Sequence, residues 1–132
     1  MKYAIKKTFQ SNVYFTGLGG TWTLADPFTT TNYLELTAGT LNTNNQPVSC
    51  LYFGSTSGLA RALNMGSTVF TLTNYYWNVS SSNFAFNAGT STIRILSPGS
   101  NYPLYGAGLT YYNVTFESSA NPGNVTGNNT FN

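Results

Sequence analysis

A short β-like unit recurs along this chain and narrows the folds that it can adopt. In each copy, alternating apolar residues lead through a short polar step to a glycine, a serine or threonine, and a second alternating stretch. The clearest copies span residues 34–44, 63–73 and 84–96, and weaker copies span 20–30 and 106–116. A unit that returns every 20–30 residues or so, at roughly constant length, is typical of stacked β-coils.

The pattern has a physical interpretation at the level of single residues. Alternation predicts two short strands per unit, so Leu34 and Leu36, like Phe84 and Phe86, should face one core. The glycine lets the backbone turn a corner without a Cβ clash, and the hydroxyl after it can bond the turn. We therefore expect an all-β fold, a right-handed parallel β-solenoid of about five short coils. A jelly-roll or other β-sandwich, which also has many short strands, is the alternative.

Helix signals are nearly absent, and the chain divides into two predicted parts. Residues 57–65 could form a helical turn or two, although glycine at both flanks disfavours even that. Residues 1–14 are predicted to form an extended N-terminal arm, in which Tyr3 and Ile5 lie on one face of a strand. Residues 15–132 are predicted to form a single β-repeat domain. The arm could pair with an exposed sheet edge of a neighbouring copy.

Charge is scarce, and this limits the partners that the sequence predicts. Charged residues make up 6 % of the chain and the net charge is +2, whereas an ordinary globular domain is about 25 % charged. Ser, Thr, Asn and Gly supply the polar surface instead, and such a surface opposes self-packing only weakly. No basic stripe predicts nucleic-acid binding, and no apolar run predicts membrane insertion. The predicted partner is another copy of the chain, arranged head to tail as a homopolymer.

The sequence offers little for catalysis. There is no histidine, so the commonest general base and metal ligand is missing. The acids Asp26, Glu35 and Glu117 each have an ordinary role in a turn, on an outward strand face or in a loop. Cys50, the single cysteine, has apolar neighbours and is expected in the core. We predict a protein that is not an enzyme and uses no cofactor or metal.

Exposed aromatic residues provide the alternative function, which is carbohydrate binding or adhesion to surface glycans. In a strand, consecutive aromatic residues cannot all point inward, and exposed rings are good surfaces for sugars. The candidate aromatic platform consists of Tyr75, Tyr76, Trp77, Tyr111 and Tyr112. Four sequons are candidate glycosylation sites if the chain meets a glycosylating pathway, at Asn78, Asn113, Asn124 and Asn128.

Parts of the chain resemble the repetitive β-helical segments of bacterial surface proteins and phage virion or tail-fibre proteins. These parts are residues 19–50, 84–93 and 108–116. The resemblance covers roughly residues 15–131 and implies a stalk, fibre or adhesion role without catalytic residues. It leads us to expect a structural subunit that self-assembles into an extracellular filament or a virion or cell-surface appendage.

The first ten residues lack the apolar stretch of a classical signal peptide. The expected location therefore requires a trimmed precursor or release by lysis.

Overall fold

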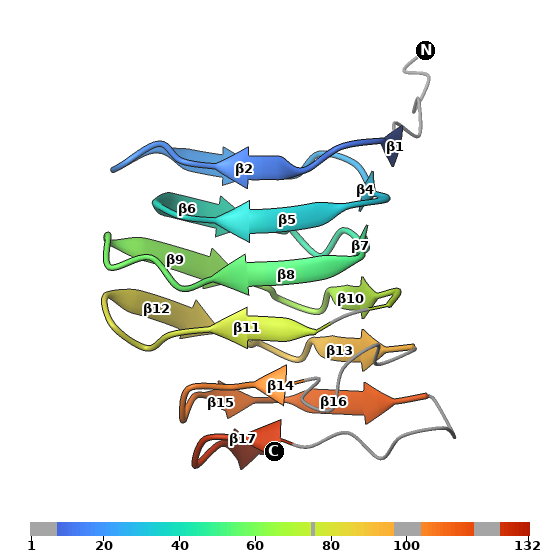
Figure 1. Cartoon of the computed structure of the whole chain (residues 1–132), viewed down its shortest axis with the longest axis vertical. Helices are drawn as coiled ribbons and strands as arrows, with labels where there is room; N and C mark the ends of the chain where they lie inside the picture. The colour runs from blue at the N-terminus through green and yellow to red at the C-terminus, as the bar shows by residue number, and fades with distance from the viewer. Residues whose placement is uncertain (1–7, 75, 97–103, 118–124) are drawn as a thin grey trace.

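The computed structural model is an all-β solenoid with its coils stacked one on another (Figure 1). It describes residues 8–74, 76–96, 104–117 and 125–132. Within these residues there are eighteen short strands, and every pair of neighbouring strands is parallel. Parallel pairing between successive coils confirms the predicted solenoid. It excludes the sandwich alternative, whose sheets are antiparallel.

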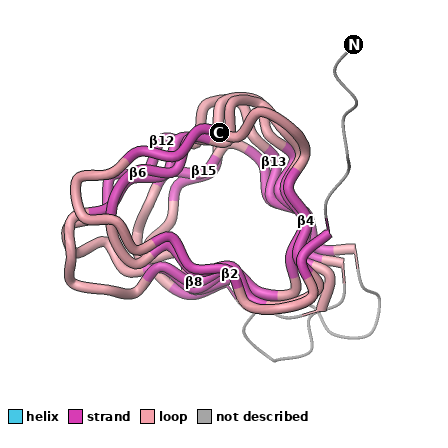
Figure 2. The backbone as a smooth tube through the Cα atoms, turned by 90° about the horizontal axis from the view of Figure 1, so that it is seen from above, coloured by secondary structure: helices cyan, strands magenta, loops and turns pink. Residues whose placement is uncertain are grey.

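Each coil contributes one strand to each of three faces, which enclose the core when viewed from above (Figure 2). The strands of the first sheet are β1 (Thr8–Phe9), β4 (Phe28–Thr30), β7 (Val48–Cys50), β10 (Val69–Leu72), β13 (Thr92–Ile95) and β16 (Asn113–Phe116). Those of the second sheet are β2 (Val13–Phe15), β5 (Tyr33–Leu36), β8 (Tyr52–Ser55), β11 (Trp77–Val79), β14 (Leu104–Tyr105) and β17 (Val125–Thr126).

The third face is built from two sheets. The upper one, called the third sheet below, contains β3 (Thr21–Thr23), β6 (Gly39–Asn42), β9 (Arg61–Asn64) and β12 (Phe84–Asn87). The lower one pairs β15 (Thr110–Tyr111) with β18 (Thr130–Phe131). In Figure 1 the near strands run from right to left while the chain descends from β2 to β17, which makes the coil right-handed, as predicted.

The core consists of columns of apolar side chains, one from each coil. Strand register places inward residues directly above one another, so each column is buried from above and below as well as from the sides. The second sheet contributes a column of side chains that are at most 1 % exposed: Leu34, Phe53, Trp77 and Leu104. The first sheet contributes Cys50, Leu72 and Ile95 in the same way. Cys50 is thus a core residue, as expected, and burying each large apolar side chain is worth about 1.5–3 kcal/mol.

The repeat units occupy different faces of the solenoid, which the sequence did not reveal. The unit at 34–44 runs from the second sheet into the third, with Gly39 (φ +81°) at the corner. The units at 63–73 and 84–96 run from the third sheet into the first, and their corners contain Gly66 and Gly89. Leu34 and Phe84 do share the core, but they enter it from different faces. The motif specifies a corner, and two of the three corners of the coil accept it.

Residues 57–65, the one stretch predicted to have helical character, contain strand β9 instead. Parallel pairing of β9 with both β6 and β12 outweighs a weak local helix preference. The side chain of Arg61, at the start of β9, is 3 % exposed. Its guanidinium donates to the carbonyl oxygens of Ser55 and Ser80 at 2.8 and 2.9 Å. It also lies 5.0 Å from the ring centre of Phe84. Arg61 therefore joins two successive coils at a corner.

The first described strands of the chain already belong to the solenoid. Strand β1 pairs with β4, and β2 pairs with β5, so part of the segment 1–14 lies in the first coil. Tyr3 and Ile5 lie outside the described residues, and pairing of this segment with another copy stays a prediction.

Candidate functional site

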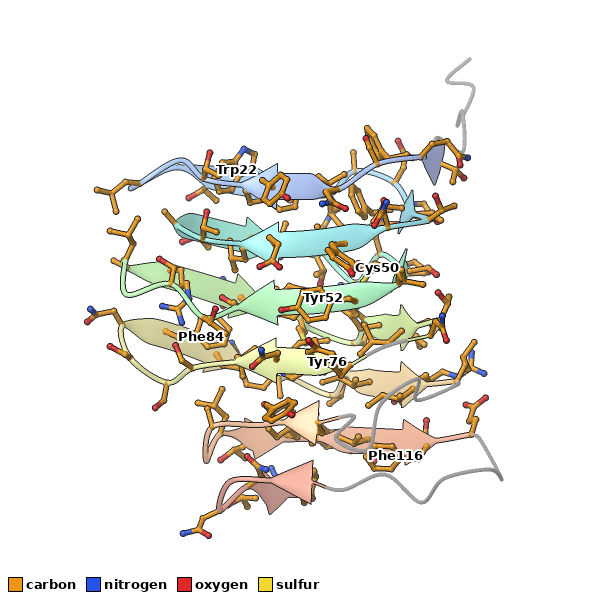
Figure 3. The ribbon with its side chains drawn as sticks, viewed as in Figure 1. Trp22, Cys50, Tyr52, Tyr76, Phe84 and Phe116 are labelled. Carbon is orange, nitrogen blue, oxygen red and sulfur yellow. The ribbon has the colours of Figure 1, made fainter. Side chains whose placement is uncertain are left out.

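A row of tyrosine side chains runs along the outer face of the second sheet, across successive coils. Tyr33, Tyr52, Tyr76 and Tyr105 make up this tyrosine row. The ring centres are 5.0 Å apart between Tyr33 and Tyr52, 4.9 Å between Tyr52 and Tyr76, and 5.7 Å between Tyr76 and Tyr105. Each of these pairs meets edge to face, which is a favourable arrangement of aromatic quadrupoles. Figure 3 shows Tyr52 and Tyr76 one below the other on the near face.

Strand alternation explains why tyrosines and one carboxylate share this face. In β5, Leu34 and Leu36 point into the core, so Tyr33 and Glu35 point outward. In β8, Phe53 is fully buried and the preceding Tyr52 is only partly buried.

Glycine in the next coil makes room for the carboxylate. Glu35 of β5 is paired in register with Gly54 of β8. A Cβ at Gly54 would overlap the carboxylate oxygens of Glu35. The carboxylate thus occupies the space that the missing side chain leaves, and it lies beside Tyr52 rather than extending into solvent.

The tyrosines and the carboxylate line a small, half-open pocket of about 210 Å³, formed by Tyr33, Glu35, Tyr52 and Tyr76. Sites for drug-sized ligands commonly measure about 300–1,000 Å³. The pocket is therefore suited to one small chemical group rather than to a large ligand.

The surroundings of Glu35 make its negative charge costly. Partial burial raises the pKa of the Glu35 carboxyl, and the neighbouring Tyr52 hydroxyl opposes part of that shift. The pKa of Tyr52 is also raised, first by burial and then by the negative charge of Glu35. A hydrogen bond with the Asn78 side chain opposes this rise in the pKa of Tyr52.

No ion pair compensates the charge of Glu35 within the described parts of the chain. The one ion pair there joins Arg94 and Glu117, at 2.7 Å. Glu35 therefore has no counter-ion among the described residues.

The predicted aromatic platform needs correction. Trp77 and Tyr111 are 0 % and 1 % exposed, and Trp77 Nε1 donates to the Tyr111 hydroxyl at 3.2 Å inside the core. Both lie on inward positions of their strands, so neither can present a ring to a sugar. Tyr112 is 37 % exposed but lies outside the tyrosine row. Tyr75 lies outside the described residues. Of the predicted platform, Tyr76 alone among the described residues belongs to the candidate site.

Sequence reasoning overlooked the other members of the row, although a signal for them was present. Tyr33 and Tyr52, like Tyr76, precede the large inward residue of a second-sheet strand, whereas Tyr105 follows Leu104. The dipeptide therefore recurs in three successive coils. Recognising it requires the coil register, because Tyr14-Phe15 looks the same in the sequence but pairs with Glu35 and Leu36, one position farther along.

The remaining candidate residues are spread over the molecule. Among the sequons, Asn78 is partly buried in β11, whereas Asn113 and Asn128 are exposed. Asn124 lies outside the described residues. Glu35 lies on an outward strand face as predicted, while Glu117 follows β16 and Asp26 precedes β4. The described residues contain no group of three or more His, Cys, Asp or Glu side chains suited to a metal ion.

Comparison of the chain with protein-family models, with curated proteins and with solved structures found no match. Among the residues that the structure describes, no helix is long and apolar enough to cross a membrane.

Proposed function

We propose that this chain is a non-enzymatic structural subunit whose copies stack head to tail into an extracellular filament or a virion or cell-surface appendage. The observation that carries the proposal is the character of the two end coils. Over the residues that the structure describes, each presents strand edges and partly exposed core residues and carries almost no charge to oppose a further coil.

The upper end is formed by β1, β2 and β3, each the last strand of its sheet. Phe15 and Trp22 pack against the core but are only partly buried, and their ring centres lie 5.0 Å apart. Residues 8–25 include no charged side chain. Natural edge strands are commonly guarded by lysine or another charge, which prevents pairing with a second molecule.

The lower end also presents edge strands, partly buried aromatic side chains and little charge. Strand β16 ends the first sheet and β18 ends the lower sheet of the third face. Phe116 is only partly buried, and Phe131 is 48 % exposed while it stacks on Tyr111 with ring centres 5.9 Å apart. Glu117 is the one charged residue in 104–117 and 125–132, and it is held in the ion pair with Arg94.

The two ends can complement each other because all the sheets are parallel. A second copy placed with its upper edge against this lower edge would continue the same strand direction and the same stacked columns. Such a contact joins different surfaces of the two copies, so it leaves a free edge at each end and propagates. With sheets six strands deep, each copy would lengthen the filament by about 30 Å at ~4.8 Å per coil.

Backbone hydrogen bonds identify a substitution that tests the edge without disturbing the coil. The Thr40 amide donates to Gly20, and the Leu24 amide donates to Asn42, so these positions of the first coil point toward β6. The alternate residue Thr21 points its amide away from β6, toward the space that a second copy would occupy. Proline at Thr21 removes that donor, whereas valine keeps it.

The test is negative-stain electron microscopy of wild type, Thr21→Pro and Thr21→Val across a concentration series. We expect concentration-dependent filaments from wild type and Thr21→Val, and mostly single particles from Thr21→Pro. Circular dichroism should show the same β-content for all three chains. Single particles of wild type at every concentration would refute head-to-tail assembly, and so would unchanged filaments from Thr21→Pro.

The carbohydrate-binding alternative rested on the aromatic platform. Burial of Trp77 and Tyr111 removes two of its members. Of the two described members that remain, Tyr76 belongs to the tyrosine row and Tyr112 does not. No observation of the described residues favours this function over assembly, so we do not put it forward.

A further inference from the structure

We propose that the pocket of Tyr33, Glu35, Tyr52 and Tyr76 binds an alkylammonium group, such as a lysine side chain or a methylated amine. This ligand site would be separate from the end coils that the assembly proposal uses, because its residues belong to the second, third and fourth coils.

The first argument is charge. Glu35 holds its carboxylate half-buried against Tyr52, and the described residues place no cation beside it. Removing a carboxylate from water without a counter-ion is costly, and an ammonium group in the pocket would offset that cost. The Tyr52 hydroxyl interacts with the carboxylate but cannot neutralise it.

The second argument is the arrangement of the rings. Tyr33 and Tyr52 meet at an interplanar angle of 65°, and Tyr52 and Tyr76 meet at 79°. Nearly perpendicular rings form walls around a small space, whereas a sugar-binding platform needs ring faces lying side by side. Aromatic walls attract a cation through the ring quadrupole, and the attraction strengthens when the cation loses water. A pocket of about 210 Å³ has room for such a group.

The third argument is that the surrounding residues position the carboxylate. The absent side chain at Gly54 leaves space for the carboxylate of Glu35. Asn78 interacts with the Tyr52 hydroxyl, which in turn interacts with Glu35. The polar groups are therefore arranged before a ligand arrives, which reduces the ordering cost of binding.

The ligand test uses three small probes on the full chain. Choline and n-butylammonium carry the cation, and 3,3-dimethylbutan-1-ol is the neutral carbon isostere of choline. Binding is followed by isothermal titration calorimetry and by shifts of tyrosine ring signals in NMR spectra. We expect both cations to bind about tenfold or more tightly than the neutral alcohol, with shifts centred on Tyr33, Tyr52 and Tyr76.

Matched variants separate the site from general surface effects. Glu35→Gln should weaken choline binding about tenfold, while Glu117→Gln should leave it unchanged. Tyr33→Leu should weaken binding several-fold, and Tyr112→Leu should not, although both tyrosines are 37 % exposed.

Binding should also depend on pH. Among the described residues, the titratable groups on this outer face are the Glu35 carboxyl and the phenols of Tyr14, Tyr33, Tyr52, Tyr76 and Tyr105. Phenols stay neutral in acid. Glu35 is the group that changes charge there, so choline affinity should fall as the pH drops and the carboxylate becomes protonated.

Three results would overturn the proposal: equal affinity for choline and its neutral isostere, no effect of Glu35→Gln, or stronger binding of neutral hexoses than of either cation. The last result would assign the pocket to carbohydrate. None of these results bears on the filament test, because Thr21 lies outside the pocket and the probes are measured on unassembled protein.

Discussion

Replacing Arg61 by methionine would remove a buried guanidinium while keeping an unbranched side chain of similar length. In the folded chain Arg61 makes six hydrogen bonds with Ser55, Leu59, Ser80 and Ser82, between 2.7 and 3.1 Å long. Burial lowers the pKa of this guanidinium, but arginine keeps its charge throughout the usual pH range.

The magnitude follows from the acceptors that would lose a donor. The Ser55 carbonyl oxygen keeps the backbone amide of Ser80 as a partner. The carbonyl oxygens of Leu59, Ser80 and Ser82 would lose the guanidinium, at about 1 kcal/mol each where water cannot replace it. The free energy of unfolding should therefore fall by about 2–4 kcal/mol, which for a chain of this length lowers the unfolding midpoint by roughly 10 °C.

The assay is thermal and urea unfolding followed by tryptophan fluorescence and circular dichroism. Arg94→Met is the matched control, because Arg94 forms an exposed ion pair with Glu117 and its loss should leave the midpoint nearly unchanged. Arg61→Lys should fall between wild type and Arg61→Met, since one ammonium cannot reach all the acceptors. If Arg61→Met unfolded within 1 °C of wild type, the inference that Arg61 joins the two coils would be wrong.

Three further predictions concern single interactions. Gly89→Ala should lower the free energy of unfolding by about 2–4 kcal/mol, because Gly89 has φ +56° and a Cβ there would overlap the Gly66 carbonyl. Tyr111→Phe should cost about 1–3 kcal/mol in urea titrations, because the buried Trp77 Nε1 loses its acceptor. Glu35→Gln should raise the thermal midpoint at pH 7. Burial raises the folded pKa of Glu35, so its charge destabilises the fold above that pKa, and the gain should vanish below about pH 4.5.

Each of these predictions has a control or an opposing outcome. Gly58→Ala should be nearly neutral, because nothing lies within 4 Å of a Cβ there and its φ is not in the left-handed region. A Tyr111→Phe chain as stable as wild type would mean that another acceptor or water satisfies Trp77. A midpoint difference between Glu35→Gln and wild type that is the same at pH 4 and pH 7 would contradict the pKa argument.

The amino-acid sequence by itself determined the local structure. Glycine at the repeat corners, alternation such as that of Leu34 and Leu36, and the return of the unit every 20–30 residues were enough to predict an all-β solenoid. Alternation also predicted that Glu35 points outward. These features depend on residues close together in the chain, where side-chain direction and backbone freedom decide the conformation.

Only the tertiary structure decided which face of the solenoid each segment occupies. The run Tyr75-Tyr76-Trp77 satisfies alternation with either Trp77 or Tyr76 inward, and a shift of one residue exchanges the two faces. The choice is made by packing, because an inward Trp77 completes the column between Phe53 and Leu104. Burial of Arg61 and the grouping of the tyrosine row were likewise decided between coils. Contacts of this kind join residues about twenty positions apart, and their register depends on the packing of the whole stack.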